Sequence, residues 1–293
     1  MKKVLITGSS GFLGQNLLKL APRNTQIIAH YCQTIPENPG SKLELFQADF
    51  RTGHWEFIQK LRPDIIIHTA AMADIDECES HPVPARKINF ETTCRLSDLA
   101  RSLGSRFIFI SSDVVFEGNR GHYKEEDKPC PLNVYARTKS EAERYILDNP
   151  SNMVVIRPAL FYGSALDSRP SFSEIMFRRL RSGQNIHAFT DQYRTPVLVK
   201  DLANAIWELV HHDYCGLLHV GGPQRFNRYE MGLVLCWIFN LDSSLLIPVK
   251  SSDVQMNAPR PLDCSLDSSR AAGILKTHFS DFEEGCRLAF SEN

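Results

Sequence analysis

The stretch KVLITGSSGFLG, residues 3–14, joins a short apolar segment to three glycines spaced three residues apart. An apolar run of this length is typical of a strand that is buried on both faces of a parallel sheet. Gly8 permits a tight turn after the strand, Gly11 lets the backbone approach a pyrophosphate, and Gly14 lets a helix pack on the strand. The stretch therefore predicts the first strand, glycine loop and helix of a dinucleotide-binding fold.

The first half of the chain repeats this strand and helix unit. Apolar segments that predict buried strands alternate with segments of helical periodicity. The predicted strands cover residues 3–8, 26–31, 64–71, 106–112 and 153–158, and the predicted helices lie near 12–20, 53–61, 82–103 and 134–148. This alternation predicts an α/β fold with a doubly wound parallel sheet, the Rossmann fold.

The regular alternation loosens after residue 158 and resumes near residue 197. We therefore expect a smaller, discontinuous C-terminal substrate lobe beside the sheet domain. The lobe is expected to comprise residues 159–196 and 223–264, and the NAD(P)-binding sheet domain residues 1–158, 197–222 and 265–293.

Composition restricts the possible functions. The 293 residues are 43% hydrophobic and 23% charged, with a net charge of −1, so we expect neither a nucleic-acid nor a membrane partner. The eight cysteines form no Cys-x-x-Cys pair, which predicts reduced thiols and no metal site. No apolar leader or membrane-spanning run is apparent, which predicts a cytoplasmic protein; a homodimer is one of the states open to it.

The predicted cofactor site lacks one common feature. The second strand ends in AHYCQT, with His30 but no carboxylate to bind the ribose hydroxyls of NAD. The missing negative charge favours NADP(H) over NAD(H), because nothing there repels a 2'-phosphate. After the third strand, Asp49 could hydrogen-bond the adenine amine with Phe50 against the ring, although Asp49 could equally cap the next turn.

The stretch NVYARTKSEAE, residues 133–143, places Tyr135 and Lys139 four residues apart. On a helix these residues share a face, and a nearby ammonium would lower the pKa of the phenol. Ala142 and Ile146 continue the face, so we expect it to turn toward the sheet. Ser112 ends the preceding strand at the carboxyl edge, where doubly wound folds bind ligands. The set predicts proton transfer at a carbonyl or alcohol; an exposed surface pair is the alternative.

Several motifs in the same order resemble the extended short-chain dehydrogenase/reductase superfamily, and within it the dTDP-4-dehydrorhamnose reductase family. The resemblance covers nearly the whole chain. Its motifs are TGSSGFLG at 7–14, HTAA at 68–71, KINFETT at 87–93, SSDVVFEG at 111–118, YARTK at 135–139, DQYRTPVLVKDLA at 191–203 and RPLDCSLDSSRA at 260–271.

The resemblance implies roles for particular residues. Ser112, Tyr135 and Lys139 would be catalytic, with Asn89 supporting the lysine through water and Lys139 also holding the nicotinamide ribose. The implied cofactor-binding residues are Gly8, Ser10, Gly11, Phe12, Leu13, Gly14, His30, Asp49, Phe50, Thr69, Ala70, Ala71, Met72, Tyr135, Lys139 and Pro158. The implied substrate-binding residues are Asp113, Val114, Arg194 and Arg260.

Residues at a few positions distinguish this chain from other branches of the superfamily. Dehydratases place Asp-Glu after the active hydroxyl, whereas Val114 follows Asp113 here, and epimerases usually carry small residues at this point. Arg194 replaces a glycine that is usual in the reductases, and Arg260 matches an arginine that binds a diphosphate. The resemblance therefore implies an NAD(P)H-dependent reductase of a keto group on a nucleotide-linked sugar.

Two alternatives remain open. The regulatory beta subunit of methionine adenosyltransferase shares this architecture, so the chain could be a non-catalytic, NADP-binding regulatory or scaffold protein. A sugar-nucleotide epimerase is the other alternative. The intact Ser112, Tyr135 and Lys139 favour an enzyme.

Overall fold

The structure, a computed structural model, describes residues 1–36, 43–53, 55–166 and 169–291. Its central feature there is a seven-stranded parallel sheet with the order β3-β2-β1-β4-β5-β6-β11. The order reverses between β1 and β4, as in a doubly wound fold. The strands are β1 Lys2–Thr7, β2 Thr25–Tyr31, β3 Leu43–Gln47, β4 Ile65–His68, β5 Arg106–Ile110, β6 Met153–Pro158 and β11 Gly216–Val220.

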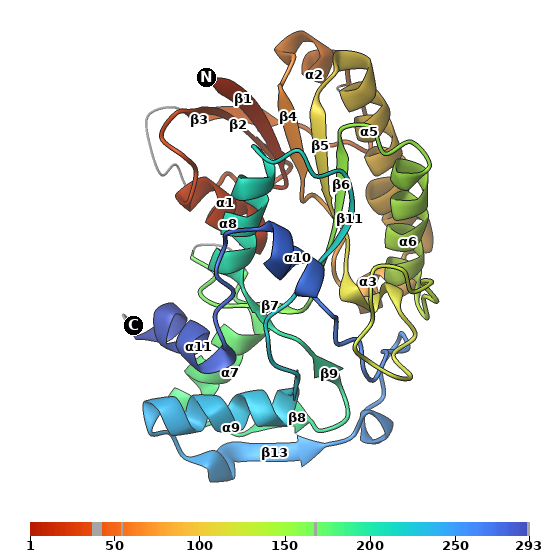
Figure 1. Cartoon of the computed structure of the whole chain (residues 1–293). Helices are drawn as coiled ribbons and strands as arrows, with labels where there is room; N and C mark the ends of the chain where they lie inside the picture. The colour runs from red at the N-terminus through yellow and green to blue at the C-terminus, as the bar shows by residue number, and fades with distance from the viewer. Residues whose placement is uncertain (37–42, 54, 167–168, 292–293) are drawn as a thin grey trace.

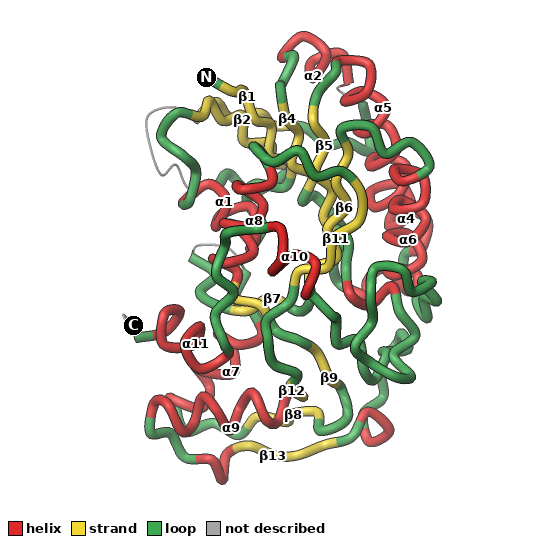
Figure 2. The backbone as a smooth tube through the Cα atoms, viewed as in Figure 1, coloured by secondary structure: helices red, strands yellow, loops and turns green. Residues whose placement is uncertain are grey.

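Helices cover both faces of this sheet (Figures 1 and 2). Because side chains alternate along a strand, Val4 and Ile6 of β1 join one buried cluster while Leu5 joins the other. The first face packs against α1 Phe12–Lys19, α8 Val199–Leu209 and α10 Ser269–Ile274, and the second against α2 Trp55–Leu61, α5 Thr92–Leu103 and α6 Val134–Leu147. The predicted doubly wound α/β sheet is confirmed.

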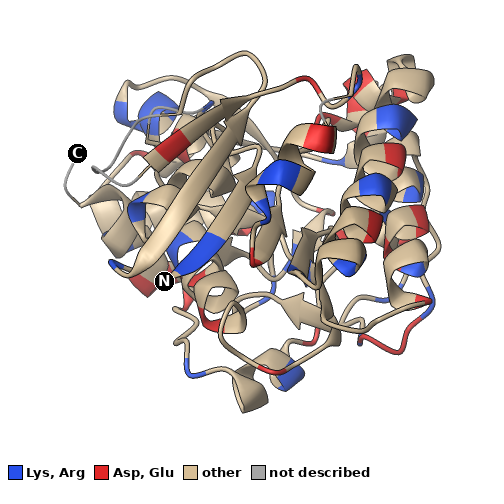
Figure 3. Cartoon of the chain, turned by 90° about the horizontal axis from the view of Figure 1, so that it is seen from above, with Lys and Arg blue, Asp and Glu red and all other residues tan. Residues whose placement is uncertain are grey.

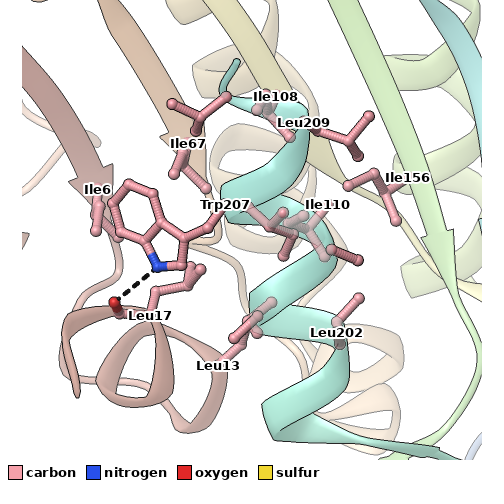
Figure 4. Packing of buried hydrophobic residues seen from close by; sticks show 14 of the residues in the cluster. Ile6, Leu13, Leu17, Ile67, Ile108, Ile110, Ile156, Leu202, Trp207 and Leu209 are labelled. Carbon is pink, nitrogen blue, oxygen red and sulfur yellow. Dashed lines mark hydrogen bonds between the residues drawn. The ribbon is translucent and has the colours of Figure 1, made fainter. Parts of the chain in front are cut away.

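The packing of α1 fixes the position of the glycine loop. Leu13 and Leu17 of α1 lie with Ile6 of the sheet and Trp207 of α8 in one apolar cluster (Figure 4). The indole Nε1 of Trp207 also donates a hydrogen bond to the backbone oxygen of Leu17 at 3.0 Å. The start of α1 is therefore anchored by the sheet on one side and by α8 on the other.

The segment expected as one helix over residues 82–103 contains a change of helical type. It begins as α4 Pro82–Arg86, passes through a π-helical turn at Lys87–Glu91, and continues as α5. The short helix α3 Ile75–Ser80 precedes it. A π-turn inserts an extra residue into the helix and is frequent at functional sites. Here it carries Asn89, one of the predicted site residues.

A second group of elements lies beyond the carboxyl edge of the sheet, at the end with α9 and β13 (Figure 1). Its buried cluster includes Tyr162, Phe177, Leu235, Leu246 and Phe282. The elements are β7 Phe161–Tyr162, α7 Phe172–Arg181, β8 Ile186–Phe189, β9 Tyr193–Arg194, β10 Val197–Leu198, β12 Phe226–Asn227, α9 Arg228–Phe239, β13 Leu246–Val249 and α11 Phe282–Phe290. Single 3-10 turns lie at Asp113–Val115, Ser243–Leu245 and Ser251–Asp253.

The C-terminal helix α11 lies within residues 265–293, the range expected to belong with the sheet domain. Phe282, Cys286 and Phe290 share the buried cluster of α7 and α9 rather than either cluster of the sheet. Rings of α11 stack on this cluster, with the centroids of Phe290 and Phe177 4.9 Å apart. The apolar face of α11 is buried against α9, so the helix covers the smaller group of elements.

Acidic and basic side chains are mixed over the helices and strands (Figure 3). The chain has 33 Lys and Arg against 34 Asp and Glu. In the part of the chain that the structure describes, every helix is too short or too polar to cross a bilayer. All eight cysteines, the four buried ones included, are free thiols.

Candidate active site

The glycine loop is shaped so that side chains are excluded from it. Gly8 has a φ of +69°, and a Cβ there would lie 2.7 Å from the Cα of Ala70. A Cβ on Gly14 would lie 2.4 Å from the backbone oxygen of Gly8. Gly11 precedes α1 without any side-chain cap, so the first N–H groups of the helix remain available. The loop thus has the form of a phosphate cradle.

A cavity of about 440 Å³ lies in front of this loop. It brings together most of the predicted cofactor residues: Gly8, Ser10, Gly11, His30, Asp49, Phe50, Thr69, Ala70 and Ala71. Its lining also includes residues that were not predicted: Cys32, Gln33, Thr34, Ala48, Arg51, Ile88 and Arg169. Leu13 is in the core and Phe12 stacks on Phe161; the predicted cofactor residues outside the lining are Phe12, Leu13, Gly14, Met72, Tyr135, Lys139 and Pro158.

His30 closes the base of the cavity. Its Nδ1 accepts the N–H of Gly8 at 3.2 Å, and its Nε2 lies 3.0 Å from the backbone oxygen of Ala48. The ring stacks on Phe50 with 4.0 Å between centroids. Burial lowers the pKa of His30 to about 4, so the ring is neutral at physiological pH. His30 therefore supports the glycine loop without placing a charge beside the cofactor site.

Asp49 is held by a neighbour that the sequence reasoning missed. The Nε and Nη2 atoms of Arg51 donate to both carboxylate oxygens of Asp49 at 2.7–3.0 Å. Arg51 holds the pKa of Asp49 below its usual value, and Lys87 contributes in the same direction. The signal was present, because Arg51 lies two residues after Asp49 in the predicted loop. The end of the cavity at Asp49 thus carries a carboxylate that is already paired with Arg51.

Ser112 and Tyr135 lie together where β5 ends and α6 begins. A hydrogen bond with Ser112 favours the phenolate of Tyr135, but burial outweighs it and raises the pKa of the phenol. The expectation that Lys139 lowers this pKa is therefore not met here, because desolvation dominates. Tyr135 keeps its proton at neutral pH.

Lys139 is fully enclosed by the sheet and α6. Its ammonium lies 4.3 Å from the ring centroid of Phe109, and 3% of the residue is exposed. Burial lowers the pKa of Lys139 to about 7, and the carboxylate of Glu143 opposes the shift. The inward face predicted for Ala142 and Ile146 is present, since both are fully buried. The exposed surface pair is thereby ruled out for Lys139.

A buried ion pair anchors the helix that carries these residues. Arg157 of β6 donates to both carboxylate oxygens of Glu143 on α6 at 2.7–3.1 Å. The side chains of Arg157 and Glu143 are 3% and 2% exposed. At its start, α6 is capped by Asn133, whose side chain accepts the N–H of Ala136. Both contacts hold the orientation of Tyr135 and Lys139 relative to the sheet.

Asn89 holds the loop after β4. Its Oδ1 accepts the N–H of Met72 at 2.9 Å, and its Nδ2 donates to the oxygen of Met72 at 3.0 Å. The same Nδ2 lies 3.3 Å from the hydroxyl of Thr138, next to Lys139. Asn89 therefore connects the loop beside the cofactor cavity to α6.

The four predicted substrate residues divide into two groups. Asp113 is buried after Ser112, accepts the hydroxyl of Ser112 at 3.2 Å, and faces Nε of Arg194 at 3.4 Å. Val114 is buried beside it. Arg260 has its Nη2 2.8 Å from the carboxylate of Asp76, and its chain neighbours Pro259 and Pro261 accept hydrogen bonds from Asn133 and Arg194. Asp113 and Arg194 are thus adjacent to Ser112, and Arg260, paired with Asp76, stands in the chain segment that Arg194 contacts.

The contacts of Arg194 are mostly with the protein itself. Its Nη1 donates to the backbone oxygens of Tyr193 and Leu262, and its Nη2 donates to that of Pro261. The residue is 6% exposed. These contacts position Arg194 and do not favour direct contact with a substrate. Within the described ranges, no group of three or more His, Cys, Asp or Glu side chains is arranged to hold a metal.

The doubly wound sheet, the glycine cradle and the Ser112, Tyr135 and Lys139 arrangement define the class: the chain is an extended short-chain dehydrogenase/reductase. More particularly, the chain belongs to the family described as RmlD substrate binding domain, which it matches over residues 1–293. The family resemblance predicted from the motifs is confirmed.

Two kinds of relative are similar to this chain. Methionine adenosyltransferase 2 subunit beta from Bos taurus is 34% identical over 275 residues, 92% of this chain and 81% of the relative. A solved structure described as a hypothetical dTDP-4-dehydrorhamnose reductase from Sulfolobus tokodaii is 34% identical, with a TM-score of 0.86, covering 96% of this chain and 98% of that one.

A third comparison supports the fold alone. The dTDP-4-dehydrorhamnose reductase from Bacillus anthracis, solved in complex with NADP, is 24% identical with a TM-score of 0.84. The match covers 100% of this chain and 99% of the Bacillus anthracis chain. The fold assignment therefore holds over the whole length.

Proposed function

We propose that the chain is an NADP(H)-dependent reductase of a keto group on a nucleotide-linked sugar. The observation that carries the proposal is the placement of Ser112, Tyr135 and buried Lys139 at the carboxyl edge of the sheet. The glycine cradle and its 440 Å³ cavity lie at the same edge. Membership of the RmlD family and the likeness to the Sulfolobus tokodaii structure support the same reaction class.

The protonation state of Tyr135 suits reduction. Burial keeps the phenol protonated at neutral pH, so Tyr135 can donate a proton to an oxygen that gains negative charge. The hydroxyl of Ser112 would polarise that oxygen, and a nicotinamide cofactor bound in the cavity would supply the hydride. Lys139 would hold the ribose of the cofactor, and Asn89 fixes the backbone between the cavity and α6.

The charges around the adenine end support NADP(H) over NAD(H). His30 is neutral and buried where a carboxylate would otherwise stand at the end of β2. Arg51 and Lys87 line a second cavity of about 220 Å³ next to the first, and Arg51 lines both. The lining of this second cavity also contains Arg95 and Glu91, so a 2'-phosphate placed there would meet three cations and one carboxylate.

The test is a comparison of Tyr135→Phe with the matched control Tyr145→Phe, which lies on the exposed side of the same helix. Purified protein would be screened for NADPH and NADH oxidation with dTDP-, GDP-, UDP- and CDP-linked 4-keto sugars. We expect Tyr135→Phe to lose about 10²–10⁴-fold in turnover while its affinity for NADPH changes less than about twofold. Tyr145→Phe should keep the turnover and the NADPH affinity of the wild type. Full turnover by Tyr135→Phe would exclude it as the proton donor.

A second candidate function follows from the relative with 34% identity, named as the beta subunit of methionine adenosyltransferase 2. In that case the chain would bind NADP(H) and act as a subunit of another enzyme. The same two variants separate the candidates, because a regulatory effect on a partner enzyme would survive Tyr135→Phe. Binding of NADPH without turnover on any of the four sugars would favour this second function.

A further inference from the structure

Arg228, which none of the predicted roles includes, lies in the charged cluster beside the catalytic serine. The strands β12 and β9 pair antiparallel, with Phe226 opposite Arg194, and Arg228 follows directly as the first residue of α9. Arg228 acts electrostatically on both Arg194 and Asp113. The cluster therefore contains two guanidinium groups and one carboxylate, next to Ser112.

The backbone at Arg228 is held firmly. Asn227 and Glu230 form a capping box, in which each side chain accepts the backbone N–H of the other at 2.8 Å. The side chain of Asn227 also donates to the backbone oxygen of Thr190 at 3.1 Å. The position of Arg228 is thus set by the cap of α9 and by the pairing of the two preceding residues, Phe226 and Asn227, with β9.

The carboxylate in the cluster is already engaged by other groups. Asp113 receives hydrogen bonds from Ser112 and from the N–H of Leu160, and it pairs with Arg194. Arg228 instead lies over the ring of Phe172, at 3.9 Å from its centroid, and its Nη1 is 4.0 Å from the sulfur of Met231. In residues 1–36, 43–53, 55–166 and 169–291, no carboxylate oxygen lies within 4.0 Å of its guanidinium.

This arrangement leaves donors of the Arg228 guanidinium available for a ligand. A guanidinium carries five N–H donors, and an aromatic face and a thioether satisfy them poorly. Burial and the positive charge of Arg194 lower the pKa of Arg228 to about 9. A partly buried guanidinium with donors free beside Ser112 is well placed to pair with a ligand.

We propose that Arg228 binds an anionic group of the substrate, a carboxylate or a phosphate, close to the carbonyl that Ser112 and Tyr135 face. The inference rests on the proposed function for the identity of the substrate. Arg260 differs from Arg228 in already having a carboxylate partner, Asp76, 2.8 Å away. In a nucleotide sugar the carboxylate would be on the sugar, whereas the phosphates link the sugar to the nucleoside.

The experiment measures binding, so it does not depend on turnover. Affinities of the full chain for UDP-glucuronate and UDP-glucose would be measured by titration calorimetry at low salt, with saturating NADP⁺, for wild type and Arg228→Gln. Loss of one charged contact should weaken binding about tenfold to a hundredfold. A loss confined to UDP-glucuronate identifies a carboxylate on the sugar, and an equal loss for both ligands identifies the phosphates.

Two further variants control this comparison. Arg179→Gln removes an exposed arginine from the same group of elements and should change neither affinity. Arg228→Lys keeps the positive charge without the forked donors and should recover part of the lost affinity. Unchanged affinity in Arg228→Gln, or binding of neither ligand by the wild type, would overturn the proposal.

Stability separates this role from a structural one. Without ligand, Arg228→Gln should unfold at the same temperature as wild type or higher, because it removes an unpaired charge next to Arg194. A merely structural arginine would lower the unfolding temperature when removed. The two proposals can fail separately. If the protein reduced none of the keto sugars but anion binding still depended on Arg228, the inferred ligand class would hold and only the proposed reaction would be wrong.

Discussion

Lys139 carries a charge that its surroundings disfavour. The ammonium has a carboxylate four residues away, Glu143, but both oxygens of Glu143 are already bound by Arg157. The ammonium of Lys139 also lies over the face of Phe109, which attracts a cation weakly compared with water. Its pKa of about 7 follows from this position.

This shift predicts how stability depends on pH. The folded pKa of Lys139 lies below the ordinary lysine value of 10.5, so the unfolded chain binds the extra proton between pH 7 and 10.5. The stability cost of Lys139 is full below pH 7 and disappears as the pH approaches 10.5. Lys139→Met should therefore raise the free energy of unfolding at pH 6, on the order of 4 kcal/mol, and by progressively less toward pH 10.

Chemical denaturation at pH 6, 7, 8, 9 and 10 checks this, with Lys200→Met as the control. Lys200 is exposed on α8, and its replacement should change stability by about 0.5 kcal/mol or less at each pH. A difference between Lys139→Met and wild type that stays constant from pH 6 to 10 would contradict the assigned pKa.

The residues of the site differ in how far the sequence could place them. Gly8, Tyr135 and Lys139 stand in motifs whose spacing relates directly to one strand and one helix. Arg228 could not be found in this way, because it reaches the site through the pairing of two-residue strands, β9 and β12. Such short pairings leave no periodic signal. Desolvation of Tyr135 was missed for a similar reason, since helical spacing shows a shared face but not the depth of burial.

At the scale of elements, the contact between the glycine loop and α1 determines the cofactor site. The loop turns back so closely that Gly14 in the helix touches the backbone of Gly8 and Ser9. These backbone atoms cannot be moved without displacing the end of β1. The first N–H groups of α1 can therefore face the loop only because residue 14 is a glycine and carries no side chain.

Gly14→Ala should disrupt this contact. Its Cβ would lie 2.4 Å from the Gly8 oxygen and 2.6 Å from the Cα of Ser9, so the loop or the helix must shift. We expect a loss of about 1–3 kcal/mol in stability and at least tenfold weaker NADPH binding, measured by thermal unfolding and by fluorescence titration.

The matched control is Gly273→Ala, another helical glycine, whose added Cβ would meet no atom within 4 Å. It should keep cofactor affinity and gain up to about 1 kcal/mol, because alanine is the better helix former. If both variants bound NADPH like wild type, the close approach at Gly14 would not be needed for the site.

Elements with a strong pattern were predictable and interrupted ones were not. The five predicted strands and α6 have clear apolar runs or helical periodicity, and each is present. The π-turn at Lys87–Glu91 was expected as plain helix, because one additional residue within a helix leaves the apolar pattern nearly unchanged. Its position is set by Asn89, which bonds to the loop at Met72.

For the whole molecule, the packing of the C-terminal helix matters most. Periodicity identified the return to the sheet near residue 197, but α11 could belong to either group of elements on sequence alone. The aromatic face of α11 packs with the smaller group of elements, because Phe282 and Phe290 contact rings from β7, α7 and α9. We propose that the substrate lobe comprises residues 159–196, 223–264 and α11, and that the remaining elements form the cofactor domain.

Hydrogen exchange of the full chain would test this division. NADP⁺ alone should protect amides of the glycine loop, the end of β2 and the loop after β3, since these line the 440 Å³ cavity. A nucleotide sugar added to that complex should mainly protect α7, the start of α9 and the loop at Asp113, because Phe172, Arg228 and Asp113 lie together there. α11 should follow α9 in its exchange rate, as their side chains share one cluster. If α11 instead exchanged in step with α1 and α8, it would belong with the sheet, as the sequence pattern predicted.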